Sequence, residues 1–248
     1  MSYLYYNSRN ILSMTTPSLS IFFPCYNDEK SIGKLVTDAT HVAQKLTDDF
    51  EIIVIDDGST DKSREVLSDL AKENKNLKLI FHEKNIGYGG ALQSGFKAAS
   101  KDLVFYTDGD GQYDVKELPI LFSLMTPDVD FINGIKMGRS DATYRIVIGN
   151  FYSLVIRWSF WLPITDVDCD FRLIRQSIVK KLNLTVTSGA ICVELVKKAQ
   201  RAGAKFRQVS VHHLERKHGN SQFFRVDRIF HTFWELGNLW IKLILEKK

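Results

Sequence analysis

The first 134 residues alternate short apolar runs with segments of helical periodicity, and this alternation restricts the fold more than any other feature. Apolar runs typical of buried strands occupy residues 20–23, 51–55, 77–81, 103–107 and 129–133. Apolar spacing typical of helices occupies residues 30–46, 61–74, 91–99 and 116–125. Strands that alternate with helices predict an α/β fold, with a mainly parallel central sheet and helices on both faces.

Polar segments rich in glycine and aspartate follow the first four predicted strands. They are residues 24–29, 56–61, 85–90 and 108–112. In open α/β sheets, ligands bind outside the carboxyl ends of the strands. We therefore expect four segments that are far apart in the sequence to meet at one rim of the sheet and to form one binding site.

The second half of the chain is less regular. Its predicted elements are helices at 145–161, 177–182 and 193–202 and strands at 171–174 and 205–211. With 248 residues and 44% hydrophobic content, the chain suits one core. We predict a flexible tail over residues 1–17, one domain over 18–222 and an amphipathic helix over 223–248.

Composition excludes several classes of protein. A charged fraction of 25% argues against disorder, and a net charge of +4 gives no sign of nucleic-acid binding. The three cysteines are widely spaced without a paired motif, which argues against a zinc or disulfide framework and fits a cytosolic protein. The most apolar window, residues 146–164, is interrupted by Asn150 and Arg157, unlike a membrane span of ~20 apolar residues.

Asp108-Gly109-Asp110 is the most specific chemical signal in the sequence. Two carboxylates at a strand end can hold a hard divalent cation, and glycine gives the turn backbone freedom. Gln112 could add an oxygen contact. Such a donor set suits Mg²⁺ or Mn²⁺ rather than zinc, and the ion would bridge the phosphates of a nucleotide-sugar. A solvated Asp-Gly turn is the alternative interpretation.

Two further segments have both a binding and a structural interpretation. A carboxylate of Asp56-Asp57, after the second strand, could accept a hydrogen bond from a nucleobase imide or a ribose hydroxyl, while Ser59, Thr60 or Asp61 could cap a helix. The glycines of residues 85–90 do not form a dinucleotide fingerprint and follow the third strand. This disfavours a nicotinamide-dependent oxidoreductase and favours a tight turn.

The chain after residue 200 is basic and then aromatic. Its bases could bind phosphate or form a solvated face, and His212, His213 and His218 lack the carboxylate spacing of a metal site. The final segment combines Trp and Phe with Lys and Arg. This pattern is typical of a helix in a membrane interface, and a core or dimer helix is the open alternative.

Taken in order, six segments resemble glycosyltransferase family 2, in particular its polyprenyl-phosphate (dolichyl-phosphate) hexosyltransferase branch. These are residues 23–29, 55–61, 85–91, 107–112, 166–173 and 216–221. The resemblance implies a GT-A fold, with a Rossmann-like nucleotide-binding half and an acceptor half. It further implies inverting transfer of a hexose from a UDP- or GDP-linked donor to a polyprenyl phosphate, by a peripheral protein at the cytoplasmic membrane face.

The resemblance also implies roles for individual residues. Those expected to contact the donor nucleoside are Pro24, Tyr26, Asp28 and Asp57. Those expected to hold Mg²⁺ or Mn²⁺ and the diphosphate are Asp108, Asp110 and Gln112, with Gly109 close by. Lys136 and Arg145 are expected near the phosphates of the donor or acceptor. Arg216 and Ser221 are expected in a loop that closes over the donor, and Glu194 in the acceptor region.

The acceptor decides whether a general base is needed. A lipid phosphate is already ionised, whereas a sugar hydroxyl needs a carboxylate such as Glu194 or Asp168 to take its proton. Two alternative functions stay open: a transferase that extends a glycan or lipid-linked oligosaccharide, and a catalytically silent nucleotide-sugar-binding subunit. A second copy of the chain or a membrane protein is a possible partner.

Overall fold

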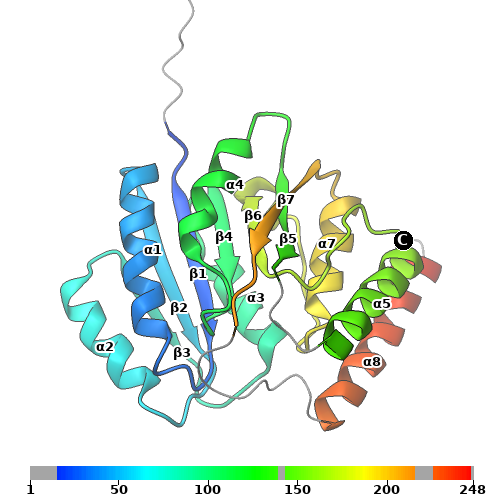
Figure 1. The fold of residues 1–248 in the computed structure, drawn as a ribbon, viewed down its shortest axis with the longest axis horizontal. Helices are drawn as coiled ribbons and strands as arrows, with labels where there is room; N and C mark the ends of the chain where they lie inside the picture. The colour runs from blue at the N-terminus through cyan, green and yellow to red at the C-terminus, as the bar shows by residue number, and fades with distance from the viewer. Residues whose placement is uncertain (1–15, 139–142, 216–225, 247–248) are drawn as a thin grey trace, which may run out of the picture.

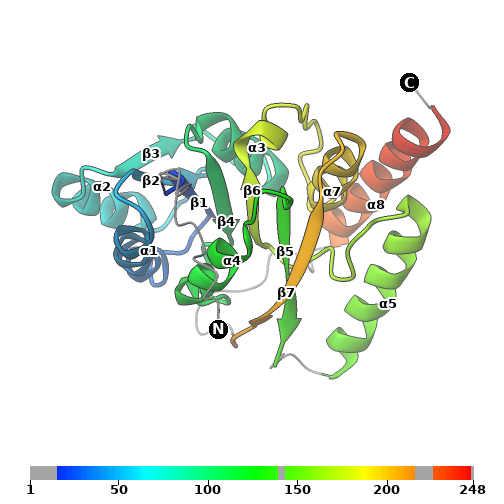
Figure 2. The ribbon, with the colours of Figure 1, turned by 90° about the horizontal axis from the view of Figure 1, so that it is seen from above.

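The computed structural model describes residues 16–138, 143–215 and 226–246. The predicted tail over residues 1–17 therefore falls mostly outside the described residues, as does the predicted domain boundary between residues 222 and 223. Within the described part, one open sheet runs through the molecule and helices pack on both of its faces (Figures 1 and 2).

The strands are β1 (Leu19–Cys25), β2 (Phe50–Asp56), β3 (Leu77–Phe81), β4 (Leu103–Thr107), β5 (Phe131–Met137), β6 (Phe171–Arg175) and β7 (Phe206–His212). Their order in the sheet is β3-β2-β1-β4-β6-β5-β7. β6 runs antiparallel to both of its neighbours, β4 and β5, and the remaining pairs are parallel. The predicted mainly parallel sheet is confirmed.

The helices are α1 (Ile32–Leu46), α2 (Ser63–Glu73), α3 (Tyr88–Ala98), α4 (Leu118–Leu124), α5 (Thr143–Phe160), α6 (Gln176–Val179), α7 (Ile191–Arg201) and α8 (Val226–Trp240). A short 3₁₀ turn precedes α4, and a π-helical segment, Ile241–Leu245, continues α8. The apolar sides of α1, α2 and α4 join one hydrophobic core, and those of α3, α5, α6, α7 and α8 join the other.

The central strands separate these two cores because successive side chains of a strand point to opposite faces. In β1, Phe22 enters the core with α3, while Ile21 and Phe23 enter the core with α1. All residues of β1 and β2 are buried, as expected for strands covered on both faces. Because both strands are held on both faces, the loops that follow β1 and β2 start from fixed positions at the carboxyl-end rim of the sheet.

Three predicted boundaries were wrong by three or more residues, and one of them is the end of the helix expected at 177–182, which stops at Val179. The strand expected at 129–133 runs from Phe131 to Met137, because β7 pairs with it as far as Met137. The helix expected from residue 91 begins at Tyr88, so Gly89 and Gly90 lie in its first turn. A Cβ on Gly89 would lie 2.3 Å from the carbonyl oxygen of Val186, so only glycine allows this close approach.

Helix α5 is apolar on two sides. Ile156 and Phe160 are buried in the core, whereas Phe151, Leu154 and Trp158 are exposed on the outer side. The end of α5 contacts the end of α8 through a hydrogen bond from Trp240 Nε1 to the Ser159 carbonyl oxygen, 2.9 Å long, and both helices lie at the same end of the molecule (Figure 1). In the described ranges, helices of membrane-spanning length and hydrophobicity are absent.

Candidate active site

The loops after β1 and β2 are joined by a network of short hydrogen bonds. Asn27 has a left-handed backbone (φ 58°), and its Oδ1 accepts from the backbone N–H of Thr60 at 2.8 Å and of Asp61 at 3.3 Å. In return, the N–H of Asn27 donates to Ser59 Oγ at 2.9 Å. Ser59 and Asp61 thus bind the loop that follows β1. The half-buried Tyr26 and Asp28 belong to that loop, which these hydrogen bonds hold in place.

Asp57 lies at the centre of this rim and is almost completely buried, with 3% exposure. Its Oδ1 is 2.7 Å from His82 Nδ1 and accepts from the N–H of Ile86 at 2.9 Å. Its Oδ2 accepts from the N–H of Gly87 at 3.0 Å. The carboxylate therefore joins the β2 loop to the glycine-rich loop, as expected from their positions after neighbouring strands.

The Asp108-Gly109-Asp110 turn packs directly against the β1 loop. A Cβ on Gly109 would lie 2.5 Å from the carbonyl oxygen of Pro24, so glycine is required here as well. Ser31 Oγ donates to the Gly109 carbonyl oxygen at 3.0 Å. The structure thus brings together Pro24, Asp28 and the acidic turn that the sequence analysis placed in one site.

Tyr88 is a site residue that the sequence analysis left inside a loop. Its hydroxyl donates to Asp108 Oδ1 at 2.7 Å. Burial raises the pKa of the Tyr88 phenol well above its ordinary value, and the nearby Asp108 raises it further. The phenol therefore stays protonated and orients Asp108 as a hydrogen-bond donor. No local pattern identifies this role, because it depends on the helix starting at residue 88.

The donor set of the acidic turn fits a hard divalent cation. Asp108 and Asp110 offer carboxylate oxygens, and Asp110 Oδ1 also accepts the backbone N–H of Gln112 at 3.0 Å. Among the residues that the structure describes, no three or more His, Cys, Asp or Glu side chains converge as a metal cage. Mg²⁺ commonly binds one or two carboxylates and takes its other ligands from substrate phosphates and water, so two acids suffice.

Lys136 lies beside an acidic segment rather than in open solvent. Its Nζ donates to the Asp168 carbonyl oxygen at 2.9 Å and lies 3.3 Å from Asp166 Oδ1, and 10% of its side chain is exposed. Burial is the main cause that raises the pKa of Asp168 to about 6. The positive charge of Lys136 lowers this pKa, and the carboxylates of Asp166 and Asp170 raise it. Asp168 is therefore a carboxyl group that can exchange a proton near neutral pH.

Below this segment, Arg172 is fully buried and fixes the strand ends. Its Nε donates to Asn133 Oδ1 at 2.7 Å, its Nη1 lies 3.2 Å from Asp170 Oδ1, and a further hydrogen bond reaches the Tyr106 hydroxyl. A buried guanidinium is stabilised only by such a complete set of acceptors. Arg172 thus holds the 166–170 segment in place beneath the rim.

Glu194 has a different environment from the one expected for an acid in the acceptor region. It is fully buried, and its carboxylate accepts the backbone N–H groups of Thr185 and Val186, each at 2.9 Å. Lys198 Nζ lies 2.6 Å from its Oε1. The carboxylate is occupied in fixing the 185–186 segment, so its observed contacts are structural.

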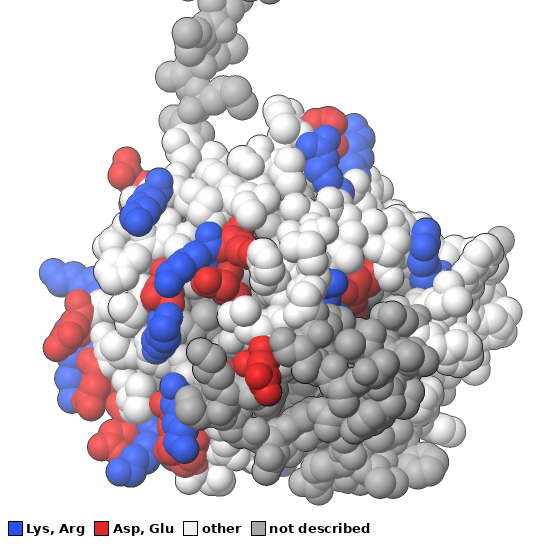
Figure 3. All heavy atoms as spheres, in the orientation of Figure 1, with Lys and Arg blue, Asp and Glu red and all other residues white. Residues whose placement is uncertain are grey.

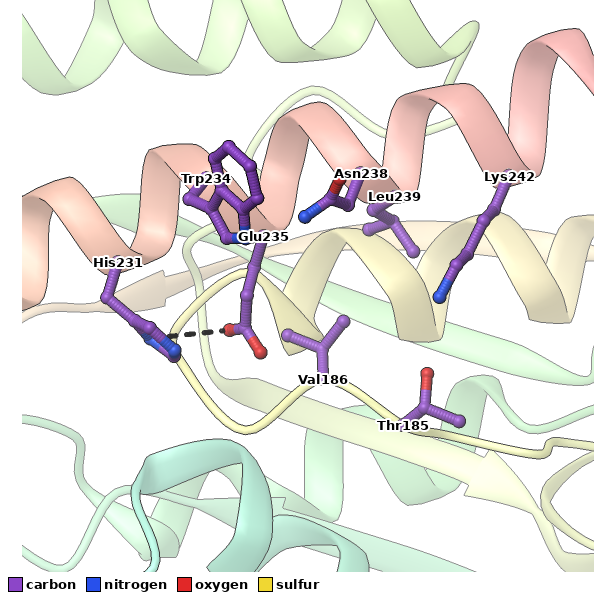
Figure 4. Close-up of a pocket in the computed structure, with 8 residues that line it drawn as sticks. All are labelled: Thr185, Val186, His231, Trp234, Glu235, Asn238, Leu239 and Lys242. Carbon is purple, nitrogen blue, oxygen red and sulfur yellow. Dashed lines mark ion pairs between the residues drawn. The ribbon is translucent and has the colours of Figure 1, made fainter.

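The segment fixed by Glu194 also connects α8 to the glycine-rich loop. The N–H of Gly89 donates to the Thr187 carbonyl oxygen at 2.8 Å, and Glu235 on α8 accepts the N–H of Ser188 at 2.9 Å. Figure 4 shows Glu235 and Trp234 at a recess of about 290 Å³ between α8 and this segment. The recess is lined by Lys242 as well, and by none of the predicted site residues among those described.

Three predicted residues cannot be placed in the site. Arg216 and Ser221 lie outside the described residues, and so does the side chain of Arg145, whose backbone is in the first turn of α5. Among the remaining predicted residues, Pro24 lies near the end of β1, Lys136 near the end of β5 and Asp168 just before β6. The others, apart from Glu194, lie in the loops that follow β1, β2 and β4.

A mainly parallel sheet whose rim gathers two acidic loops and a glycine-rich loop is typical of α/β proteins that bind ligands at the carboxyl ends of their strands. The family model described as "Glycosyl transferase family 2" matches residues 20–182. The chain belongs to this family, which confirms the resemblance found in its motifs.

Two curated relatives are undecaprenyl-phosphate 4-deoxy-4-formamido-L-arabinose transferases. The protein of Pseudomonas fluorescens (strain SBW25) is 29% identical over 206 residues, which cover 83% of this chain and 60% of the relative. That of Yersinia pestis (strain Pestoides F) is 28% identical over 215 residues, covering 86% of this chain and 65% of the relative. The chain thus spans less than two thirds of the length of these relatives.

Solved structures of glucosyl-3-phosphoglycerate synthase from Mycobacterium tuberculosis have a similar fold. The complex with Mn²⁺, UDP and glucosyl-3-phosphoglycerate superposes with a TM-score of 0.67 and 18% identity, over 91% of this chain and 79% of that chain. The complex with Mg²⁺ and UDP gives a TM-score of 0.66 and 16% identity. The likeness confirms the predicted GT-A fold.

Proposed function

We propose that this chain transfers a sugar from a nucleotide-sugar to a polyprenyl phosphate at a membrane surface. The observation that carries the proposal is the Asp108-Gly109-Asp110 turn packed against the β1 loop, with Asp57 on the neighbouring loop. This arrangement offers one end for a nucleoside and one for a diphosphate. The two curated relatives, which are named as undecaprenyl-phosphate sugar transferases, support a lipid phosphate as the acceptor class.

In this proposal, Pro24, Tyr26, Asp28 and Asp57 contact the nucleoside, and Gly109 lets the diphosphate approach the backbone. Asp108, Asp110 and Gln112 hold Mg²⁺ or Mn²⁺, which would neutralise the charge that develops on the departing diphosphate. Tyr88 keeps Asp108 in one orientation. The Mn²⁺ and Mg²⁺ complexes of the structurally similar synthase support the choice of ion.

The acceptor end needs positive charge more than a general base. A lipid phosphate is ionised near neutral pH, so the main obstacle is repulsion between two anions. Lys136, Arg145, Arg216 and Ser221 are proposed to lower that repulsion and to close the site. The engagement of Glu194 with Thr185 and Val186 is consistent with a reaction that does not use it as a base.

The outer side of α5 supports contact with a membrane. Phe151, Leu154, Val155 and Trp158 follow the i, i+3, i+4, i+7 spacing of one helix face, and 43–71% of each is exposed. Trp234 on α8 is 71% exposed at the same end of the molecule. Figure 3 shows charged side chains gathered over α1 and α2, away from α5.

Exposed tryptophan and phenylalanine beside cations such as Arg157 and Lys242 suit the headgroup region of a bilayer. We propose that α5 and α8 hold the protein peripherally at the cytoplasmic membrane face, where a lipid-linked acceptor is available. Three buried free cysteines, Cys25, Cys169 and Cys192, fit that reducing compartment.

One observation favours a second candidate, transfer to a sugar hydroxyl. Asp168, with a pKa of about 6, could take the proton of a hydroxyl acceptor. In that case the chain would extend a glycan or a lipid-linked oligosaccharide, and Asp168→Asn would abolish transfer while leaving donor binding intact.

The experiment that tests the main proposal combines the purified chain with Mn²⁺ or Mg²⁺, a panel of radiolabelled nucleotide-sugars and a short polyprenyl phosphate. We expect label to move into the lipid phosphate. Transfer into a glycan acceptor alone would favour the second candidate. Nucleotide-sugar binding without transfer to either acceptor would instead indicate a silent binding subunit.

A further inference from the structure

Asp57 accepts hydrogen bonds unevenly on its two carboxylate oxygens. Oδ1 receives two, from His82 Nδ1 at 2.7 Å and from the N–H of Ile86 at 2.9 Å. Among the described residues, Oδ2 receives one, from the N–H of Gly87 at 3.0 Å. Each carboxylate oxygen offers two acceptor positions. Oδ1 is therefore filled, while Oδ2 keeps one position, and 5% of the side chain remains accessible.

His82 is fixed from two sides. Because an ionised carboxylate can only accept, Nδ1 carries the proton and donates to Asp57, and Nε2 lies 2.9 Å from the Ser94 hydroxyl oxygen. Ser94 belongs to α3, and the backbone N–H of His82 donates to the Asp56 carbonyl oxygen at 2.9 Å. With 12% of its side chain exposed, the imidazole has little freedom to release Oδ1.

The number of acceptor positions distinguishes between nucleobases. Uracil presents one imide N–H, at N3, whereas guanine presents two adjacent donors, N1–H and the N2 amino group. A carboxylate that binds the guanine edge needs a position on each oxygen, in the way that it receives the two N–H groups of an arginine. At Asp57 the second oxygen is already occupied by His82 and Ile86. A guanine would leave one donor unpaired, which a buried polar site rejects strongly.

We propose that His82 is a positioning residue that fills Oδ1 of Asp57, leaves one acceptor position for the base of the donor and thereby selects uracil over guanine. This inference rests on the proposed function, because it takes the nucleoside of the donor to lie at Asp57. It narrows the donor from a nucleotide-sugar in general to a UDP-sugar.

The test measures the binding of UDP and GDP to the full chain in Mn²⁺ by calorimetry. The variants are His82→Asn, whose amide nitrogen can occupy the place of Nδ1, and His82→Leu, which has no donor. We expect wild-type protein to bind UDP at least about tenfold more tightly than GDP. His82→Asn should keep this ratio within about threefold, and His82→Leu should reduce it about tenfold, because Oδ1 becomes available to guanine.

Several results would overturn the inference. Wild-type preference for GDP, an unchanged ratio in His82→Leu, or equal losses in both variants would each show that the hydrogen bond to Asp57 does not select the base. A second measurement needs no variant: N3-methyl-UDP should bind wild-type protein at least about tenfold more weakly than UDP, and equal binding contradicts a contact at N3. If the wild type binds neither UDP nor GDP, the proposed function itself fails.

Discussion

Replacement of the two most exposed rings of α5, Phe151→Ala with Trp158→Ala, should weaken membrane binding without unfolding the protein. Phe151 is 68% exposed and Trp158 71% exposed, seven residues apart on the same helix face. Their removal costs few internal contacts, because the buried side of the helix is formed by Ile156 and Phe160. The double variant should therefore melt within a few degrees of the wild type.

The magnitude follows from the exposed area. An aromatic side chain buries about 150–250 Å² when fully covered, so each ring leaves roughly 140 Å² in water. At about 25 cal/mol per Å², both rings together would contribute roughly 7 kcal/mol if they left water completely. A helix lying in the headgroup region removes about half of that area, which gives about 3.5 kcal/mol. Since 1.4 kcal/mol is a factor of ten, the double variant should bind vesicles about 300-fold more weakly.

The assay is co-sedimentation with vesicles that contain anionic lipid. Phe81→Ala is the matched control, because Phe81 is an exposed aromatic residue (43%) on β3, at the opposite edge of the molecule from α5 (Figure 1). The control should bind like the wild type. If the double variant also binds within about twofold of the wild type, the outer side of α5 does not contact the bilayer and the reasoning is refuted.

Three further predictions concern single acids. Glu194→Gln should lower the free energy of unfolding, measured by urea titration, by about 2–4 kcal/mol and leave turnover per folded molecule nearly unchanged. A loss of turnover without a loss of stability would contradict a structural role for Glu194. Asp110→Ala should abolish both turnover and Mn²⁺ binding, and EDTA should inhibit the wild type, whereas Asp114→Ala, which removes an acid that caps the next turn, should retain both. Burial by itself would raise the pKa of Glu51, but hydrogen bonds from Lys78, Ser20 and Ser100 lower it to about 2. Because the folded-state pKa of Glu51 is below the ordinary 4.5, its ionised carboxylate adds about 3 kcal/mol to the free energy of unfolding. This contribution is fully present above pH 4.5 and is lost as the pH falls through 2. Glu51→Gln should flatten the pH dependence of urea unfolding over that range, and an unaltered profile would argue against the effect.

The sequence was a good guide to elements that depend on neighbouring residues. Apolar runs and helical spacing predicted the strands and most helices, because periodicity reflects which side of an element is buried. The acidic turn at Asp108 and Asp110 was predicted from its place after a strand, and the structure places Pro24 against it. The boundaries of β5 and α3 were less predictable, since pairing with β7 and the close approach of the 186–187 segment to Gly89 determine them.

The sequence could not reveal which side chains the folded chain brings into contact. Nothing local marks His82 as the partner of Asp57, 25 residues away, or Tyr88 as the partner of Asp108. The expectation for Glu194 came from its position in the chain, whereas the structure shows its carboxylate occupied by the 185–186 segment. Each contact exists only because two elements are packed side by side.

The sequence by itself determined the α/β class, the acidic rim and the family, because strand and helix periodicity and ordered motifs are properties of contiguous residues. Only the tertiary structure decided that β6 runs antiparallel, that Glu194 is buried and that α5 carries an apolar side directed outward. It also decided which oxygen of Asp57 keeps an acceptor position. The physical reason is that burial and hydrogen-bond occupancy belong to pairs of distant segments, and they are fixed when the sheet and its helices pack together.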